Sequence, residues 1–257
     1  RRNDVLNSMN NQGYINEESK INSQRSELEV LPPKTSIRAP HFVFYTKNQL
    51  ESYYGIKTVE EGGLKVKTTL DNIIQEESEK ILREELEKIS YLNVTNGAIL
   101  VTRPSTGEIL TMVGSVDYFN QPYGAFNVTT ALRQPGSSIK PIMYSLALQK
   151  GYTAASILDD SPVVFNIAGS ESHRPVNYDD KFHGKVPLRY ALANSYNIPA
   201  VRTLNNLGVN NFIDFATKMG ISTWNDRSRF GLSLTLGGGE VTMIDMAEAF
   251  GVLANLA

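Results

Sequence analysis

Cysteine is absent from the 257-residue sequence, which excludes a disulfide scaffold and any zinc site built from thiolates. An excess of one charge is absent too, because 25 basic and 27 acidic residues are mixed along the chain and give a net charge of -2. No basic stripe is present, so nucleic acid is not an expected partner. No window approaches the roughly 18 apolar residues that a membrane span needs. The hydrophobic content of 41% is enough for a sizeable core.

Histidine is scarce, and none of His41, His173 and His183 has a metal-ligand spacing such as His-x-x-x-His. We therefore expect no metal site and no cofactor. A Ser-His-Asp triad would need one of these histidines and a serine elbow, G-x-S-x-G. GLSLT (231–235) nearly matches the elbow but ends in threonine, and we interpret it as structural.

The segment GGGEVT (237–242) follows an apolar run, as a dinucleotide-binding loop would. A threonine replaces the third glycine, and no Lys-Ser/Thr pair of a phosphate-binding loop is present. We predict a tight turn here.

Hydrophobic periodicity predicts a mixture of helices and antiparallel strands, with most helices short and beginning at prolines. Asp71 is a suitable helix cap, and the helix after it should carry Ile74, Ile81, Leu82, Leu86 and Ile89 on one apolar stripe. Two apolar runs joined by a turn with Gly107 predict a hairpin of two buried strands. The expected elements are a strand at 64–70, a helix at 71–89, hairpin strands at 97–104 and 109–115, and helices starting at Pro141, Pro187 and Pro199.

The first residues predict a helix that turns at Gly13 and restarts after the cap Asn16. Three prolines in residues 31–40 then indicate an extended connector and a domain boundary. The chain begins with Arg1 and stops inside an apolar helical pattern (247–257), so we expect it to be a piece of a longer protein.

The segment QPGSSIKP (134–141) places Ser137 and Lys140 three residues apart, about one helical turn. A serine at a helix start has its own N–H and the positive end of the helix beside it, which favours an oxyanion on an acyl substrate. Lysine becomes a base only when neutral, and burial lowers its pKa toward that state. The alternative is a capped helix with a solvated lysine.

A second element lies at ANSYNIPA (193–200). If this loop is extended, Ser195 and Asn197 point the same way and face one cleft as a hydroxyl relay and an amide. Taken singly, Ser-x-Asn is most often only a turn.

Together, these segments resemble the transpeptidase domain of class A penicillin-binding proteins, the bifunctional peptidoglycan synthases. The segments occur in family order and cover nearly the whole chain. They are TTLD (68–71), TGEIL and MVGS (106–115), RQPGSSIKP (133–141), VNYDDKFHG (176–184), ANSYNIPAV (193–201) and LGGGEVT (236–242), and VLNSMNNQGYI resembles the end of the glycosyltransferase domain.

The resemblance implies an α+β fold, multi-helix with an antiparallel sheet, of the penicillin-binding protein and serine β-lactamase kind. Ser137 would be the nucleophile that accepts the acyl group of a D-alanyl-D-alanine stem peptide, and Lys140 its base. Ser195 would pass the proton to the leaving D-alanine, and Asn197 would bind the substrate amide. Ser138 would be a bystander. β-Lactam antibiotics would acylate Ser137.

The family's Lys-Thr-Gly motif is missing, since Lys34-Thr35 and Lys67-Thr68 are followed by serine and threonine. We interpret this as truncation before the C-terminal strands, which predicts that the chain alone is inactive. The alternatives are a D,D-carboxypeptidase or β-lactamase, and a non-catalytic peptidoglycan-binding scaffold.

The expected organisation is the end of a glycosyltransferase domain with its connector (1–38), an interdomain segment (39–95) and an incomplete transpeptidase domain (96–257). The resemblance also implies a membrane-anchored parent protein on the outer face of the bacterial cytoplasmic membrane, acting within cell-wall synthesis complexes.

Overall fold

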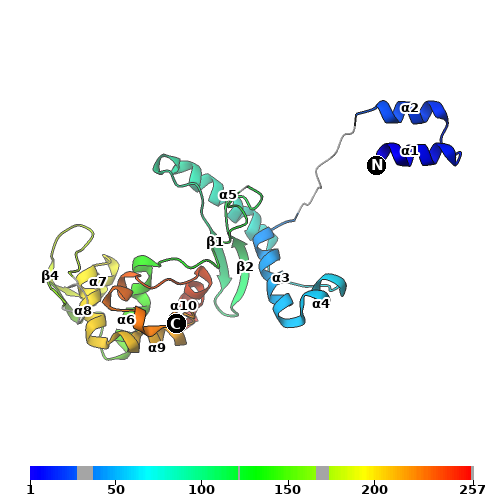
Figure 1. Cartoon of the computed structure of the whole chain (residues 1–257). Helices are drawn as coiled ribbons and strands as arrows, with labels where there is room; N and C mark the ends of the chain where they lie inside the picture. Colours follow the sequence, from blue (N-terminus) through cyan, green and yellow to red (C-terminus); the bar gives the residue numbers. More distant parts are fainter. Residues whose placement is uncertain (28–36, 121, 166–173, 256–257) are drawn as a thin grey trace. The chain divides into compact units, whose positions relative to one another are not determined.

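The computed structural model describes residues 1–27, 37–120, 122–165 and 174–255 (Figure 1). The chain divides into two compact units, Arg1–Arg38 and Ala39–Ala257. Most of the predicted connector, the Lys34-Thr35 pair and His173 lie outside the described residues. The assignment of three domains stays a prediction.

The first unit is a pair of helices, α1 (Arg2–Asn11) and α2 (Glu17–Arg25), which confirms the predicted turn and restart. The side chain of Asn16 caps α2, accepting a backbone N–H at 2.8 Å. The guanidinium of Arg2 donates to the backbone oxygen of Gln24 at 2.7 Å. Neither helix has a buried residue, and polar contacts such as these join the pair.

The second unit contains the predicted hairpin, β1 (Ile99–Arg103) and β2 (Glu108–Val113), paired antiparallel with a register shift between Val101 and Thr102. Its burial was only partly predicted. The second half of β2 is buried, but β1 is half-buried and ends exposed, because a two-stranded sheet has no strand enclosed by two others.

Helix α5 (Asn72–Lys88) confirms the helix predicted after the cap Asp71, whose carboxylate accepts two backbone N–H groups. The predicted apolar stripe is wrong in part, since Ile81 is 42% exposed and Gln75 is buried instead. The amide of Gln75 accepts the N–H of Met112 in β2 at 3.0 Å, so a polar contact joins this helix to the hairpin.

The strand predicted at 64–70 is wrong, because this stretch has no regular secondary structure. Its end lies beside β2 and is joined to it by single hydrogen bonds. The hydroxyl of Thr69 donates to the backbone oxygen of Ile109, and the N–H of Asp71, the residue after the stretch, donates to the backbone oxygen of Leu110. Before it lie α3 (Pro40–Tyr54) and α4 (Ile56–Glu61), and after α5 comes the 3-10 turn η1 (Ser90–Leu92).

The main core of the second unit lies among its C-terminal helices (Figure 1). The predicted short helices are present, and a second antiparallel pair of strands, which the sequence pattern did not predict, packs beside them. The helices are α6 (Lys140–Gln149), α7 (Leu188–Ala193), α8 (Asn197–Leu207), α9 (Val209–Lys218) and α10 (Met243–Asn255); the 3-10 turns are η2 (Gly136–Ile139), η3 (Arg227–Arg229) and η4 (Leu232–Leu236); the strands are β3 (Ile157–Asp160) and β4 (Gly184–Pro187).

The helix-rich architecture with small antiparallel sheets confirms the predicted α+β class. Across the described stretches of the chain, no helix combines the length and the apolar character that crossing a membrane requires.

Candidate active site

The candidate nucleophile lies in η2, the 3-10 turn that leads into α6. Gly136 begins the turn with a φ of +58°, a backbone conformation that favours glycine. Ser137 follows it and is exposed, whereas Ile139 and Lys140 are fully buried. Ser138 donates its hydroxyl hydrogen to the backbone oxygen of Pro135 at 2.6 Å. The turn therefore leaves Ser137 exposed to solvent, whereas the hydroxyl of Ser138 is hydrogen-bonded within the turn.

The glycine-rich segment after η4 supports this turn. Gly237, with a φ of +87°, packs against Gly136 so closely that a Cβ at position 237 would lie 2.2 Å from the Gly136 nitrogen. Arg133 and Val241 also exchange two backbone hydrogen bonds of 2.9 Å. The segment at 237–242, predicted as a tight turn, thus braces the entry to α6.

Lys140 has a side chain with no exposed surface, yet its ammonium is surrounded by oxygen atoms. Its Nζ donates to the backbone oxygens of Ser195 at 2.6 Å and Tyr196 at 3.3 Å. It also donates to Ser195 Oγ at 3.1 Å and Asn197 Oδ1 at 2.7 Å. The structure thus brings together three of the four predicted site residues, Lys140, Ser195 and Asn197.

Burial lowers the pKa of Lys140 from its ordinary value to about 8. At that pKa about one lysine in ten is neutral at pH 7, against about one in 2500 for an unperturbed lysine. Lys140 is therefore suited to accept a proton near neutral pH. Ser137 lies one turn before Lys140, although all four hydrogen-bond acceptors of Lys140 within the described residues lie at 195–197.

The C-terminal turn of α7 positions Ser195 beside Lys140. The N–H of Ser195 donates to the backbone oxygen of Leu192 at 3.0 Å, and the N–H of Tyr196 donates to that of Ala191 at 2.9 Å. This pattern is a Schellman motif, in which the residue at the Ser195 position is left-handed and is usually glycine. Ser195 has a φ of +54°, which stores backbone strain at this position.

The extended backbone conformation predicted for Ser195 and Asn197 is wrong. Ser195 is left-handed, and Asn197 is the first residue of α8, two residues before the proline expected to start that helix. Both side chains nevertheless reach Lys140, because the turn between α7 and α8 aims them at the same atom.

Two buried polar residues without a predicted role, Asp160 and Asn177, lie behind Asn197. Asn177 Oδ1 accepts the backbone N–H of Asn197 at 2.8 Å. Asn177 Nδ2 donates to both carboxylate oxygens of Asp160, at 2.9 Å and 2.8 Å. The one sequence signal was that VNYDDKFHG, which contains Asn177, resembles a family segment.

The described histidines do not form a catalytic triad. His41 Nε2 lies 2.8 Å from Ser115 Oγ, and burial lowers the pKa of His41. Ser115 donates its own proton to the backbone oxygen of Gly124 at 2.6 Å, so the histidine must donate to the serine and cannot act as its base. His183 contacts Asp160 rather than a serine.

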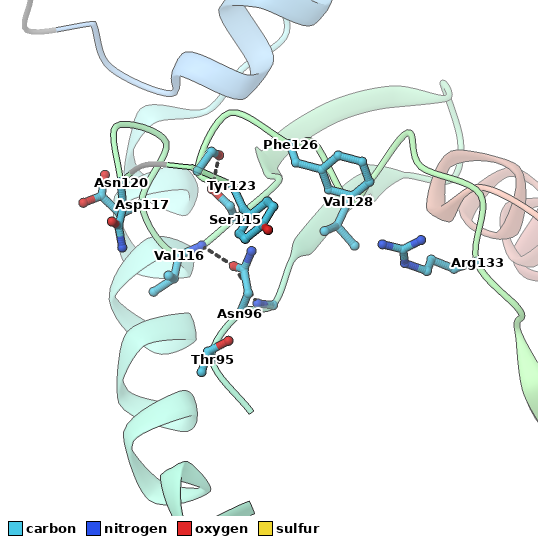
Figure 2. A pocket seen from close by; sticks show the side chains of 12 residues that line it. Thr95, Asn96, Ser115, Val116, Asp117, Asn120, Tyr123, Phe126, Val128 and Arg133 are labelled. Atoms are coloured by element: carbon cyan, nitrogen blue, oxygen red, sulfur yellow. Dashed lines mark hydrogen bonds between the residues drawn. The ribbon is translucent and has the colours of Figure 1, made fainter. Parts of the chain in front are cut away.

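A hollow of about 710 Å³ lies beside the end of β2 and the loop that follows it (Figure 2). Asn96, Ser115, Tyr123, Phe126 and Arg133 are among the residues that line it. None of the predicted site residues lines it. Arg133, which lines the hollow, precedes the exposed Ser137 by four residues.

Comparisons with known proteins agree with the resemblance. Residues 97–256 match the family described as "Penicillin binding protein transpeptidase domain". Penicillin-binding protein 1A of Rickettsia bellii is 38% identical over 161 residues, 62% of this chain and 20% of the relative. Penicillin-binding protein 2D of Bacillus subtilis is 35% identical over 222 residues, 85% of this chain and 31% of the relative. The chain thus spans less than a third of the length of either relative.

Solved structures show the same fold. Penicillin-binding protein 1A from Haemophilus influenzae superposes with a TM-score of 0.78 over 99% of this chain and 52% of that one, at 23% identity. PonA1 from Mycobacterium tuberculosis, solved in complex with penicillin V, gives a TM-score of 0.70 over 85% of this chain and 59% of that one, at 22% identity. The chain belongs to the penicillin-binding protein transpeptidase family, and within it to the class A proteins.

Proposed function

We propose that this chain is part of a peptidoglycan D,D-transpeptidase in which Ser137 is the nucleophile and Lys140 its base. The observation that carries the proposal is the state of Lys140: its side chain is fully buried, and its pKa lies at about 8. A lysine in this state, one turn from an exposed serine, is what acyl transfer by a serine-lysine pair requires.

In the first step, Ser137 Oγ attacks the carbonyl carbon of the penultimate D-alanine while Lys140 takes the hydroxyl proton. The peptide C–N bond then breaks, and the terminal D-alanine leaves with a proton delivered through Ser195, whose Oγ lies 3.1 Å from Lys140 Nζ. The amine of a second stem peptide attacks the acyl-serine ester, which forms the cross-link and restores the Ser137 hydroxyl.

Among the described residues, one N–H of the Asn197 amide has no hydrogen-bond partner. Its Oδ1 accepts from Lys140, and one N–H of its amide donates to the backbone oxygen of Val176 at 2.8 Å. The second N–H of the same amide is available to a substrate carbonyl. The backbone N–H of Ser137 would supply one oxyanion donor.

The second oxyanion donor and the cation for the substrate carboxylate would come from a Lys-Thr-Gly strand, which this sequence does not contain. Lys67 and Thr68 line a different hollow with Phe42 and Tyr45 and do not replace it. We therefore propose that the chain needs further residues of its parent protein for turnover.

The proposal extends to ligands and location. Stem peptides would be the substrates, and β-lactams would acylate Ser137 as slowly released analogues. The parent protein would be anchored in the cytoplasmic membrane, would face outward and would work within cell-wall synthesis complexes.

Labelled penicillin tests the site. The full-length protein is incubated with the label, and the adduct is mapped by mass spectrometry. We expect the adduct on Ser137 in the wild type, none in Ser137→Ala, and normal labelling in the matched control Ser138→Ala. An adduct on another residue, or labelling of Ser137→Ala, would show that the assignment is wrong.

The fate of the acyl group separates the transferase from a hydrolase. With a D-alanyl-D-alanine donor and an amine acceptor, we expect the transfer product to dominate. If hydrolysis dominates while Ser137 is still acylated, the protein is a carboxypeptidase or β-lactamase instead. If Ser137 is never acylated, the scaffold alternative holds.

A further inference from the structure

A buried anion lies behind the candidate active site and has no part in the proposed reaction. Asp160, the last residue of β3, has no exposed surface. Its carboxylate accepts hydrogen bonds from the amide of Asn177 and from the backbone N–H of His183 at 3.0 Å. The His183 ring contacts it as well, with Nδ1 at 2.7 Å from Oδ2. A buried carboxylate with this many partners is expensive to desolvate, so the arrangement calls for an explanation.

Asp160 determines which way the amide of Asn177 points. A carboxylate accepts hydrogen bonds and cannot donate them, so the NH₂ group of Asn177 must face Asp160. The same NH₂ group donates to the backbone oxygen of Lys181 at 2.8 Å. The oxygen of Asn177 therefore faces the opposite way, where it accepts the backbone N–H of Asn197.

Two neighbouring residues thus hold Asn197. Asn177 accepts its backbone N–H, and the backbone oxygen of Val176 accepts one N–H of its side-chain amide. With that N–H fixed, the amide oxygen of Asn197 faces Lys140 at 2.7 Å. A chain of hydrogen bonds therefore links Asp160 to Asn177, Asn177 to the backbone N–H of Asn197, and the side-chain oxygen of Asn197 to the Lys140 ammonium.

His183 supports the chain from the other side. Its ring stacks on Tyr196 with 4.1 Å between ring centroids, and its Nε2 lies 3.2 Å from Asp179 Oδ2. The backbone oxygen of Tyr196 is one of the acceptors around Lys140. Among the described residues, the ionisable groups around these hydrogen bonds include Asp160, Asp179 and His183. They also include Tyr144, one turn after Lys140 on α6, whose pKa is raised by burial and further by the charge of Asp160.

We propose that Asp160 and Asn177 are positioning residues, which hold the amide oxygen of Asn197 against Lys140 and so set the geometry and the proton affinity of the base. This inference rests on the proposed role of Lys140. It assigns a function to the buried carboxylate that Ser137, Lys140, Ser195 and Asn197 do not require by themselves. The competing explanation is that Asp160 only fastens the segment 174–183 to β3.

The test compares Asp160→Asn with Asp159→Asn in the full-length protein. Asp159 is the adjacent residue of β3, but its side chain is 45% exposed, lies 3.8 Å from Arg202 and accepts the backbone N–H of Ser161. The rate of acylation by labelled penicillin is measured from pH 6 to 10, and the fraction of labelled protein corrects for any that is misfolded. Asn177→Ala is the second variant and decides the question if Asp160→Asn does not fold.

We expect Asp160→Asn and Asn177→Ala to acylate at least tenfold more slowly per labelled site, because small displacements of reacting groups have large effects on rate. We also expect the pH midpoint of acylation to move down, since Lys140 loses an acceptor that stabilises its charged form. Asp159→Asn should match the wild type in rate and midpoint.

An unchanged rate per labelled site overturns the inference, and so does a slower rate with an unchanged midpoint, which would indicate the fastening role alone. The proposed function is tested separately by the wild type. If wild-type Ser137 is labelled, the results for the variants test only the role of Asp160 and Asn177. If it is not labelled, both proposals fail.

Discussion

The ammonium nitrogen of Lys140 lies 2.7 Å from the amide oxygen of Asn197 and 2.6 Å from the backbone oxygen of Ser195. Both acceptors stabilise the charged lysine, while burial of its side chain destabilises that charge. Burial is the stronger influence, because the pKa falls to about 8. This balance leads to the first prediction.

Acylation by penicillin should increase with pH and reach half of its maximum near pH 8, because only neutral Lys140 can accept the Ser137 proton. The measurement is the acylation rate of the full-length protein from pH 6 to 10. A midpoint near the ordinary lysine value, or a rate independent of pH, would contradict the role of Lys140 as the base.

The same pKa predicts how stability changes with pH. The folded-state pKa of about 8 lies below the unfolded value, so the unfolded state binds more protons between about pH 8 and 10.4. The free energy of unfolding should therefore rise across this window, by on the order of 3 kcal/mol from this group. Denaturant titrations of the wild type and of Lys140→Met check it, because the variant should lack this rise.

Ser195→Gly should separate stability from activity. Glycine adopts the left-handed conformation at the end of α7 without strain, so we expect a gain of about 1 kcal/mol in the free energy of unfolding. Acylation should fall about a hundredfold, because the hydroxyl beside Lys140 is removed.

The matched control is Asn93→Gly, since Asn93 is also left-handed, with a φ of +58°, and is not a site residue. It should leave acylation unchanged. Equal acylation by Ser195→Gly and the wild type would remove Ser195 from the mechanism.

Gly237→Ala should disturb the turn that carries Ser137. Its Cβ would lie 2.2 Å from the Gly136 nitrogen, and position 237 is left-handed as well. We expect a loss of roughly 2 kcal/mol or more in the free energy of unfolding and a clear fall in acylation.

Gly231→Ala is the control, because a Cβ there meets nothing within 4 Å and the backbone is extended. Thermal unfolding and penicillin labelling of both variants give the comparison. Equal behaviour of the two variants would show that contact with Gly237 does not hold the turn.

Local signals in the sequence predicted much of the fold. The cap at Asp71 gave the start of α5, and two apolar runs around Gly107 gave the hairpin. The strand at 64–70 failed because alternation alone does not provide a partner with regular hydrogen bonds. β3 and β4 were missed because each has only four residues, too few to show a period.

The sequence allowed the residues of the candidate site to be predicted, but not the backbone geometry that positions them. Spacing placed Lys140 one turn from Ser137 and singled out Ser195 and Asn197 in ANSYNIPA, and the resemblance implied the role of each residue. The left-handed backbone of Ser195 could not be predicted, since serine does not favour it and only the Schellman contacts to α7 explain it. Asn177 and Asp160 were not predicted as site residues, because their contacts are with residues distant in the sequence.

The four oxygen atoms around Lys140 all belong to three consecutive residues, 195–197, at the junction of α7 and α8. The lysine and the serine belong to a single turn at the start of α6. The alignment of the proposed catalytic residues thus depends on how these two short segments are placed, and α6 and α8, which carry or adjoin them, pack against each other. A substitution buried between these helices would shift the four oxygen atoms around Lys140 together. It would thereby change reactivity toward β-lactams without altering any residue that a drug contacts.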